Sequence, residues 1–277
     1  MGVVHRSCVG YVAEPFASLV ARYPGGDVYP IEDFRIEWGP IFHRGRLDGS
    51  ARVLVLGQDP ATHEAISRRI LVGEAGQRVQ GLLAKVGVTT SYAMVNVYLY
   101  SVFGQHAADA HVDDEEIAAY RHAWLDALLV GSGVTAVVAL GTLAQRAYRA
   151  WARSQPATAA GLHLCAIRHP TYAEGFARAS GRPLAETTAE QLADWNAHLP
   201  GLAEHVTSEG PVDLTPYAAS WGPGDLVRIP EGDLPAGSPS WWQDLEPWAV
   251  RVGPNAQVKR ATISVAVPEG ARTWPAL

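Results

Sequence analysis

The chain has 277 residues, of which 48% are hydrophobic and 18% are charged, and its formal net charge is −6. This composition excludes wholesale disorder. The sequence has no run of roughly 20 apolar residues and no hydrophobic leader, so we expect no membrane helix and a cytoplasmic protein. The negative charge does not exclude a nucleic-acid partner, because affinity for nucleic acid depends on the local field around a site.

Short apolar runs alternate with amphipathic stretches through residues 1–205. In chain order, the pattern predicts a helix over Val12–Val20, a strand over Arg52–Leu56, a helix over Val79–Val86, a strand over Tyr92–Val97, a helix over Glu115–Val130, a strand over Val134–Leu140, a helix over Gly141–Trp151, a strand over Leu162–Ile167 and a helix over Ala185–Leu199. Strands that alternate with helices imply a parallel sheet covered on both faces. We therefore predict an α/β domain of three layers, α/β/α, with a central, mostly parallel sheet.

Residues 206–277 differ in composition from the rest of the chain. They hold ten of the 19 prolines and five of the nine tryptophans, including Trp274. Lys259–Val267 is the clearest strand candidate, so we predict a small β-rich C-terminal extension. The adjacent Trp241 and Trp242 are expected to pack across an edge of the main sheet rather than line a ligand groove, because clustered aromatic residues more often fill cores.

Polar segments follow three of the predicted strands. Gln58 and Asp59 come after the first strand, Asn96 lies near the end of the second, and Arg168 and His169 come after the fourth. In open α/β sheets, ligands bind beyond the carboxyl ends of the strands. The sequence therefore predicts a functional site at this edge.

Five segments resemble, in the same order, motifs of the uracil-DNA glycosylase superfamily. Gly57–His63 (GQDPATH) resembles the water-activating loop GQDPYH, Ile70–Leu83 resembles PFVGxAGxLLxxLL, Asn96-Val97 resembles the asparagine after the next strand, Val137–Gly141 resembles VxALG, and His169-Pro170-Thr171 resembles His-Pro-Ser. The resemblance spans roughly Asp33 to Leu199. It implies a monofunctional DNA glycosylase that flips a base out of DNA and leaves an abasic site.

The resemblance also implies a catalytic pair. Asp59 would stabilise the positive charge that grows on the sugar and would position water, and His169 would donate a hydrogen bond to the departing base. Without the resemblance, the alternatives are a turn cap for Asp59 and a locally satisfied histidine before a proline turn for His169.

Four residues are expected to form the base pocket. The Asn96 amide would bind the Watson–Crick edge of the base, in an orientation that suits uracil or, when flipped, cytosine. Gln58 would add contacts, and Ala61 and Leu71 stand where the family has a tyrosine and a phenylalanine. The alternative for Asn96 is a tie between two loops through backbone hydrogen bonds.

Residues around His169 are expected to contact the DNA strand. Tyr172 and Phe176 stand where the family carries the wedge that fills the hole left by the base. Arg168 would contact phosphates. The alternatives are core positions for the two aromatic residues and a solvated basic face for the arginine.

The departures at Ala61 and Leu71 bear on the substrate. The family's tyrosine crowds the C5 edge of the base, and its phenylalanine stacks on the ring of the base. Because Ala61 and Leu71 supply neither contact, the pocket that determines base specificity is expected to differ from that of the uracil enzymes. Uracil in DNA repair is the default substrate, and the alternative is a pyrimidine with a bulky C5 group, such as the hydroxymethylated or glucosylated bases of bacteriophage DNA, removed in antiviral defence. A non-catalytic DNA-binding module and a hydrolase of free nucleosides stay open as other classes.

No cofactor, metal or membrane partner is expected. The histidines lack HxxxH or HExxH spacing, and the two cysteines, Cys8 and Cys165, cannot supply the iron–sulfur site of some relatives. The expected partner is DNA, double- or single-stranded, and the chain is expected to act as a monomer.

Overall fold

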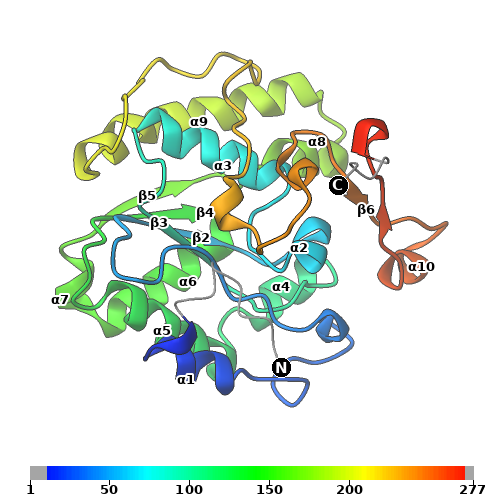
Figure 1. Ribbon diagram of the computed structural model, residues 1–277, viewed down its shortest axis with the longest axis horizontal. Coiled ribbons are helices and arrows are strands. Elements are labelled where there is room, and N and C mark those ends of the chain that lie inside the picture. The colour runs from blue at the N-terminus through cyan, green and yellow to red at the C-terminus, as the bar shows by residue number, and fades with distance from the viewer. Residues whose placement is uncertain (1–10, 272–277) are drawn as a thin grey trace, which may run out of the picture.

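A five-stranded sheet forms the centre of the computed structural model, which describes residues 11–271 (Figure 1). Its strands are β1 (Arg44–Gly45), β2 (Val53–Gly57), β3 (Tyr92–Asn96), β4 (Ala136–Leu140) and β5 (His163–Ile167), in the order β1-β3-β2-β4-β5. Strands β2 to β5 run parallel, and β1 pairs with β3 in the antiparallel sense. The predicted sheet is confirmed.

Helices cover both faces of the sheet. In chain order they are α1 (Phe16–Ala21), α2 (Thr62–Ser67), α3 (Glu74–Lys85), α4 (Gln105–His111), α5 (Glu115–Leu129), α6 (Gly141–Ser154), α7 (Pro156–Ala159), α8 (Tyr172–Ser180) and α9 (Leu184–His205). Helices α3 and α9 lie on one face, and α1, α5 and α6 lie on the other (Figure 1). The predicted three layers are therefore confirmed. Among the residues described, no helix is both long and apolar enough to cross a membrane.

Alternate residues of each buried strand enter two separate cores. In β2, Leu54 and Leu56 pack with α5 and α6, whereas Val53 and Val55 pack with α3 and α9. Successive side chains of a strand point to opposite faces, so a strand buried on both faces must be apolar throughout. This is why the short apolar runs marked the strands correctly.

Several predicted helices have different bounds in the structure. Helix α3, expected from Val79, already begins at Glu74, and α6, expected to end at Trp151, continues to Ser154. Helix α1 starts only after Pro15, and Val12, which was expected on its buried side, is 70% exposed. Helix α9 does not end at Leu199 but continues through Pro200 to His205. Burial of Leu199 and Leu202 in the core compensates for the hydrogen bond that the proline cannot donate.

The β-rich character predicted for residues 206–277 is wrong for the part that is described. Its strands there are β6 (Ala249–Val250) and β7 (Ser264–Val265), and most of the remaining chain is irregular, because proline has no N–H to donate to a sheet. The predicted strand at Lys259–Val267 begins inside helix α10 (Ala256–Arg260). The Asn255 side chain starts that helix by accepting a hydrogen bond from the N–H of Val258 at 2.9 Å.

The extension packs closely on the rest of the molecule. Trp241, Trp242 and Trp248 form a cluster with Ile66 of α2 and Val72. The rings of Trp242 and Trp248 stack with centroids 5.0 Å apart. The tryptophans therefore pack, as predicted, but against α2 and the segment before α3 rather than across an edge of the sheet. Trp274 lies outside the described residues.

Candidate active site

The polar segments singled out in the sequence meet at one edge of the sheet. Gly57 at the end of β2 pairs with Asn96 of β3, and Leu140 at the end of β4 pairs with Ile167 of β5. Strand β4 also pairs with β2, so the segments that follow β2, β4 and β5 lie next to one another.

A cavity of about 880 Å³ opens at this edge. Seven of the nine predicted site residues line it: Gln58, Asp59, Ala61, Arg168, His169, Tyr172 and Phe176. Leu71 and Asn96 are not part of its lining and lie beside Gly57 instead. A Cβ atom at residue 57 would come within 2.3 Å of Asn96 Oδ1 and 3.9 Å of Leu71 Cδ1. Glycine at this position therefore leaves the space that the Asn96 amide occupies.

Asp59 is oriented by two hydrogen bonds. The backbone N–H of Val102 donates to Oδ2 at 2.9 Å, and the Gln58 amide donates to Oδ1 at 3.1 Å. Burial raises the pKa of Asp59 to about 6, against the opposing effect of these two bonds and of Arg35. The carboxylate is thus charged at neutral pH and is a stronger base than an exposed aspartate.

The start of α2 is held by Glu64 rather than by Asp59. Glu64 Oε2 accepts the N–H of Ala61 at 3.0 Å, and Oε1 accepts the N–H groups of Val72 at 2.9 Å and Gly73 at 3.3 Å. Its buried carboxylate therefore joins the loop after β2 to the segment before α3. This role of Glu64 could not be predicted, because no local sequence pattern reveals hydrogen bonds between two loops.

His169 has a single ring donor, Nε2–H. The N–H of Thr171 donates to Nδ1 at 3.2 Å, so Nδ1 is unprotonated and the ring proton resides on Nε2. Burial, with a smaller contribution from the charge of Arg78, lowers the pKa of His169 to about 4. The imidazole is therefore neutral at pH 7. Gly141, with φ of 81°, allows the close approach of this histidine, because a Cβ atom there would lie 3.2 Å from His169 Cβ.

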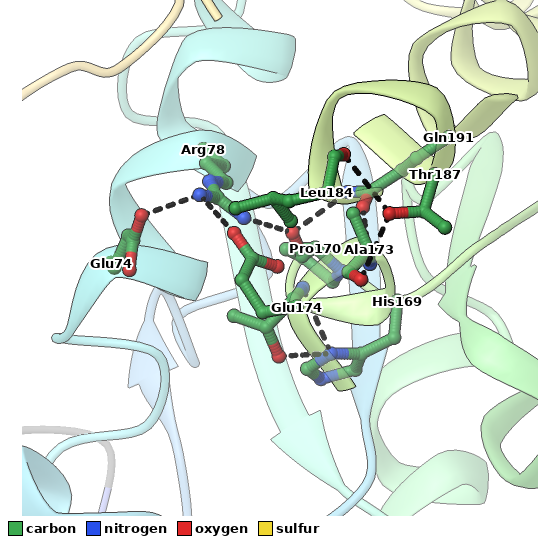
Figure 2. A network of polar contacts seen from close by, with 10 residues as sticks. Glu74, Arg78, His169, Pro170, Ala173, Glu174, Leu184, Thr187 and Gln191 are labelled. Atoms are coloured by element: carbon green, nitrogen blue, oxygen red, sulfur yellow. Dashed lines mark hydrogen bonds and ion pairs between the residues drawn. The ribbon is translucent and has the colours of Figure 1, made fainter. Parts of the chain in front are cut away.

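Two helices hold the segment that carries His169 (Figure 2). Arg78 of α3 donates from Nη1 to the Pro170 carbonyl at 2.5 Å, and Gln191 of α9 donates to the same oxygen at 2.7 Å. Both side chains are buried, and Arg78 also pairs with Glu174 at 2.7 Å. The position of His169 thus depends on residues outside the cavity, which sequence motifs do not mark.

Tyr172 and Phe176 lie one turn apart on α8. Their rings stack with centroids 5.3 Å apart, and both side chains are half-buried and line the cavity. They are not core residues. The guanidinium of Arg168 lies 4.7 Å above the Tyr172 ring and 3.6 Å from Glu190.

Several residues that the sequence analysis did not single out also line the cavity, among them Arg35, Val102, Thr142, Gln145 and Arg251. Thr142 follows Gly141 directly and Gln145 lies one turn later in α6, so their place after a strand end could have indicated them. The two arginines lie in irregular segments that carry no signal. With Arg168, three guanidinium groups line the cavity beside one carboxylate, so the local charge is opposite in sign to the net charge of −6.

No group of three or more His, Cys, Asp or Glu side chains within residues 11–271 is placed to hold a metal ion. Cys165 is a buried thiol of β5, and Cys8 lies outside the described residues.

The comparison with known protein families is consistent with this geometry. The model of the uracil DNA glycosylase superfamily matches residues 44–203, which is more than half of the chain. The matched region contains the five-stranded sheet, Asp59 and His169. A search of curated proteins finds no match.

Proposed function

Because the chain belongs to the uracil DNA glycosylase superfamily, we propose that it hydrolyses the N-glycosidic bond of a pyrimidine-type base flipped out of DNA and leaves an abasic site. The observation that carries this proposal is the pairing of two groups in one cavity. Asp59 after β2 is a carboxylate at neutral pH, and His169 after β5 is a neutral hydrogen-bond donor. These are the charge states that the reaction requires.

Asp59 acts on the sugar side of the breaking bond. The bond between C1′ and the base nitrogen breaks with its electron pair leaving on the base, so positive charge develops on the sugar. The carboxylate stabilises this charge and orients a water molecule, whose oxygen bonds to C1′ while its proton passes to Asp59. A pKa of about 6 makes this carboxylate a better proton acceptor than an exposed aspartate.

His169 acts on the departing base. Its Nε2–H donates to a base oxygen on which negative charge grows, and a donor fixed in advance for such a charge typically contributes about 10²–10³ in rate. The hydrogen bond from Thr171 to Nδ1 fixes the tautomer that makes this donation.

Asn96 is the proposed reader of the base. Asn96 does not line the cavity, but its buried Oδ1 has, within the described residues, no hydrogen-bond partner, which supports a role as acceptor for an N–H group of a pyrimidine. This favours base recognition over the alternative in which Asn96 ties two loops together. Leu71, in the left-handed region with φ of 55°, is the neighbouring apolar contact.

The room beside Ala61 favours a substrate with a bulky C5 group as a second candidate to uracil. Ala61 is exposed to a cavity of about 880 Å³, near the upper end of the range of roughly 300–1,000 Å³ for ligand cavities. Two side chains that could have replaced the missing ring are engaged elsewhere. His63 accepts the N–H of Ala249 at 3.3 Å, and the Tyr98 hydroxyl donates to the Ala108 carbonyl at 2.5 Å.

The test is incubation with oligonucleotides that carry uracil, thymine, 5-hydroxymethylcytosine or its glucosylated form, followed by alkali cleavage of abasic sites. We expect release of at least one of these bases, and loss of that release by orders of magnitude in Asp59→Asn and His169→Ala. Binding of DNA without any release would support the non-catalytic module instead. Release from free nucleosides, without DNA affinity, would support a nucleoside hydrolase.

A further inference from the structure

Two arginines from distant parts of the chain, Arg35 and Arg251, line the same cavity as Asp59. Arg251 follows β6, in the segment of residues 249–265, and β6 contacts α2 (Figure 1). This segment is held in place at two points. The N–H of Ala249 donates to His63 Nε2 at 3.3 Å, and Arg35 Nη1 donates to the Arg260 carbonyl at 3.0 Å.

The guanidinium groups of this region form a cluster of like charge. Those of Arg35 and Arg260 lie 4.4 Å and 3.7 Å from the centre of the Phe103 ring. Burial, followed by the charge of Arg251, lowers the pKa of Arg35 to about 10. Keeping three like charges together in this way costs folding free energy unless an anion offsets the repulsion.

Carboxylates of the described chain do not neutralise the cluster. None of the ion pairs formed within the described residues includes Arg35, Arg251 or Arg260. Glu37 acts on Arg35 and Arg251 only at longer range, and Asp59 acts on Arg35 in the same way. In addition, Nη2 of Arg251 is buried without a hydrogen-bond partner. The cluster thus has both uncompensated charge and an unused donor.

From these contacts we infer that residues 249–265 form one side of the DNA-binding groove, and that Arg251 and Arg35 bind a backbone phosphate beside the flipped nucleotide. A phosphodiester carries the missing negative charge and suits the planar donor set of arginine. Asp59 lines the same cavity, so the phosphate belongs to the nucleotide in the site or to its neighbour. This inference rests on the proposed function, because it assumes that DNA enters this cavity.

The test measures binding of oligonucleotides that contain only the four ordinary bases, so that no base release is needed. The dissociation constant of wild type, Arg35→Gln and Arg251→Gln is followed by fluorescence anisotropy between 50 and 200 mM salt, about the range over which phosphate contacts weaken strongly. Each substitution is expected to weaken binding about tenfold at low salt. The slope of log affinity against log salt should fall by about 0.9 for duplex DNA or about 0.7 for a single strand.

Arg153→Gln is the matched control, because Arg153 is an exposed arginine at the end of α6 that does not line the cavity. Arg251→Lys should keep the slope, since it keeps the charge. The slope of log affinity against log salt reports the number of ionic contacts made by the folded molecules. It can therefore still be interpreted if a variant is partly unfolded.

Three results would overturn the inference. One is a slope for Arg251→Gln and Arg35→Gln equal to that of Arg153→Gln. Another comes from a parallel titration with oligonucleotides that carry a C5-modified base: weakening seen only with that DNA would place the contact on the base substituent. The third is wild-type protein that binds no DNA at all, which would overturn the proposed function as well.

Discussion

The guanidinium of Arg78 donates a hydrogen bond to the carbonyl oxygen of Pro170, the residue directly after His169. Arg78→Gln removes this bond and the ion pair with Glu174. We expect kcat to fall about 10- to 100-fold with little change in KM, because a misplacement of about 1 Å can cost roughly 10²-fold in rate.

Arg78 would act here as a positioning residue, and a second measurement separates this role from general stability. Its charge helps to lower the pKa of His169, so the pKa measured by NMR titration should rise in Arg78→Gln. Lys85→Gln, on the same helix but bonded to Thr215, should leave both kcat and this pKa unchanged. Unchanged turnover in a folded Arg78→Gln protein would contradict the assignment, and Arg78→Lys should restore part of the loss.

The pH profile should report Asp59 alone. Its pKa of about 6 means that the carboxylate forms as the pH rises through that value, whereas His169, with a pKa of about 4, is neutral throughout. We therefore expect kcat/KM, measured from pH 4.5 to 9, to increase up to about pH 6 and then level off. A fall in kcat/KM between pH 6 and 8 would instead indicate that a protonated histidine is needed.

The charge of Asp59 should reduce the stability of the fold. The folded chain holds this proton more tightly than an exposed aspartate does, so stability is lost as the pH rises from about 4 to above 6. Asp59→Asn should therefore raise the free energy of unfolding by about 1–3 kcal/mol at pH 7.5, with a gain that shrinks towards pH 4. Urea unfolding at both pH values checks this, and equal stabilities at pH 7.5 would disprove it.

Ala61→Tyr should close the room for a C5 group. A tyrosine ring at this exposed position would project into the cavity and meet the C5 edge of the base. We expect the variant to lose release of a glucosylated or hydroxymethylated pyrimidine and to keep any uracil activity. Ala61→Ser, which adds little volume, is the control. Strong uracil release by wild type, with no action on any C5-substituted base, would eliminate the second substrate candidate.

Trp248 should stabilise the whole molecule through the extension. Its side chain is 4% exposed, stacks on Trp242 and meets the His63 ring at 4.7 Å. Trp248→Ala should lower the free energy of unfolding by about 3–5 kcal/mol, as for other large aromatic side chains removed from a core. Leu214→Ala, at an exposed position in the same extension, should change it by less than about 0.5 kcal/mol. A matching small effect at both positions would show that the extension contributes little.

The sheet, and the meeting of Asp59 and His169 in one cavity, could be predicted because their signals are local. Strands β2 and β4 are buried on both faces, so each is an unbroken apolar run, and each ends at or just before a glycine. Asp59 and His169 lie in short segments after strands, where the family motifs are written. The sequence therefore contains both the elements and the edge at which they meet.

Other features depend on contacts between distant segments and could not be predicted. A proline such as Pro200 usually marks the end of a helix, yet α9 continues past it because its later residues pack in the core. Glu64 bonds to the segment before α3, and Arg78 bonds to a loop 92 residues further along the chain. Arg251 reaches the cavity through the packing of the tryptophan cluster and the hydrogen bonds of Ala249 and Arg260 to distant residues. In each case, the tertiary contact outweighs the local preference or has no local pattern at all.

The separation of Ala61 from the strands has a consequence for how this chain can evolve. Asp59 and His169 follow strands of one hydrogen-bonded ladder, in which neighbours lie about 4.8 Å apart, so their spacing is inherited with the sheet. Ala61 stands outside that ladder, at the exposed start of α2. Under the proposed function, mutations at this codon would change which base is removed while the catalytic pair stays in place. A lineage under changing selection could follow new chemical marks in DNA by drift and selection at a few loop positions.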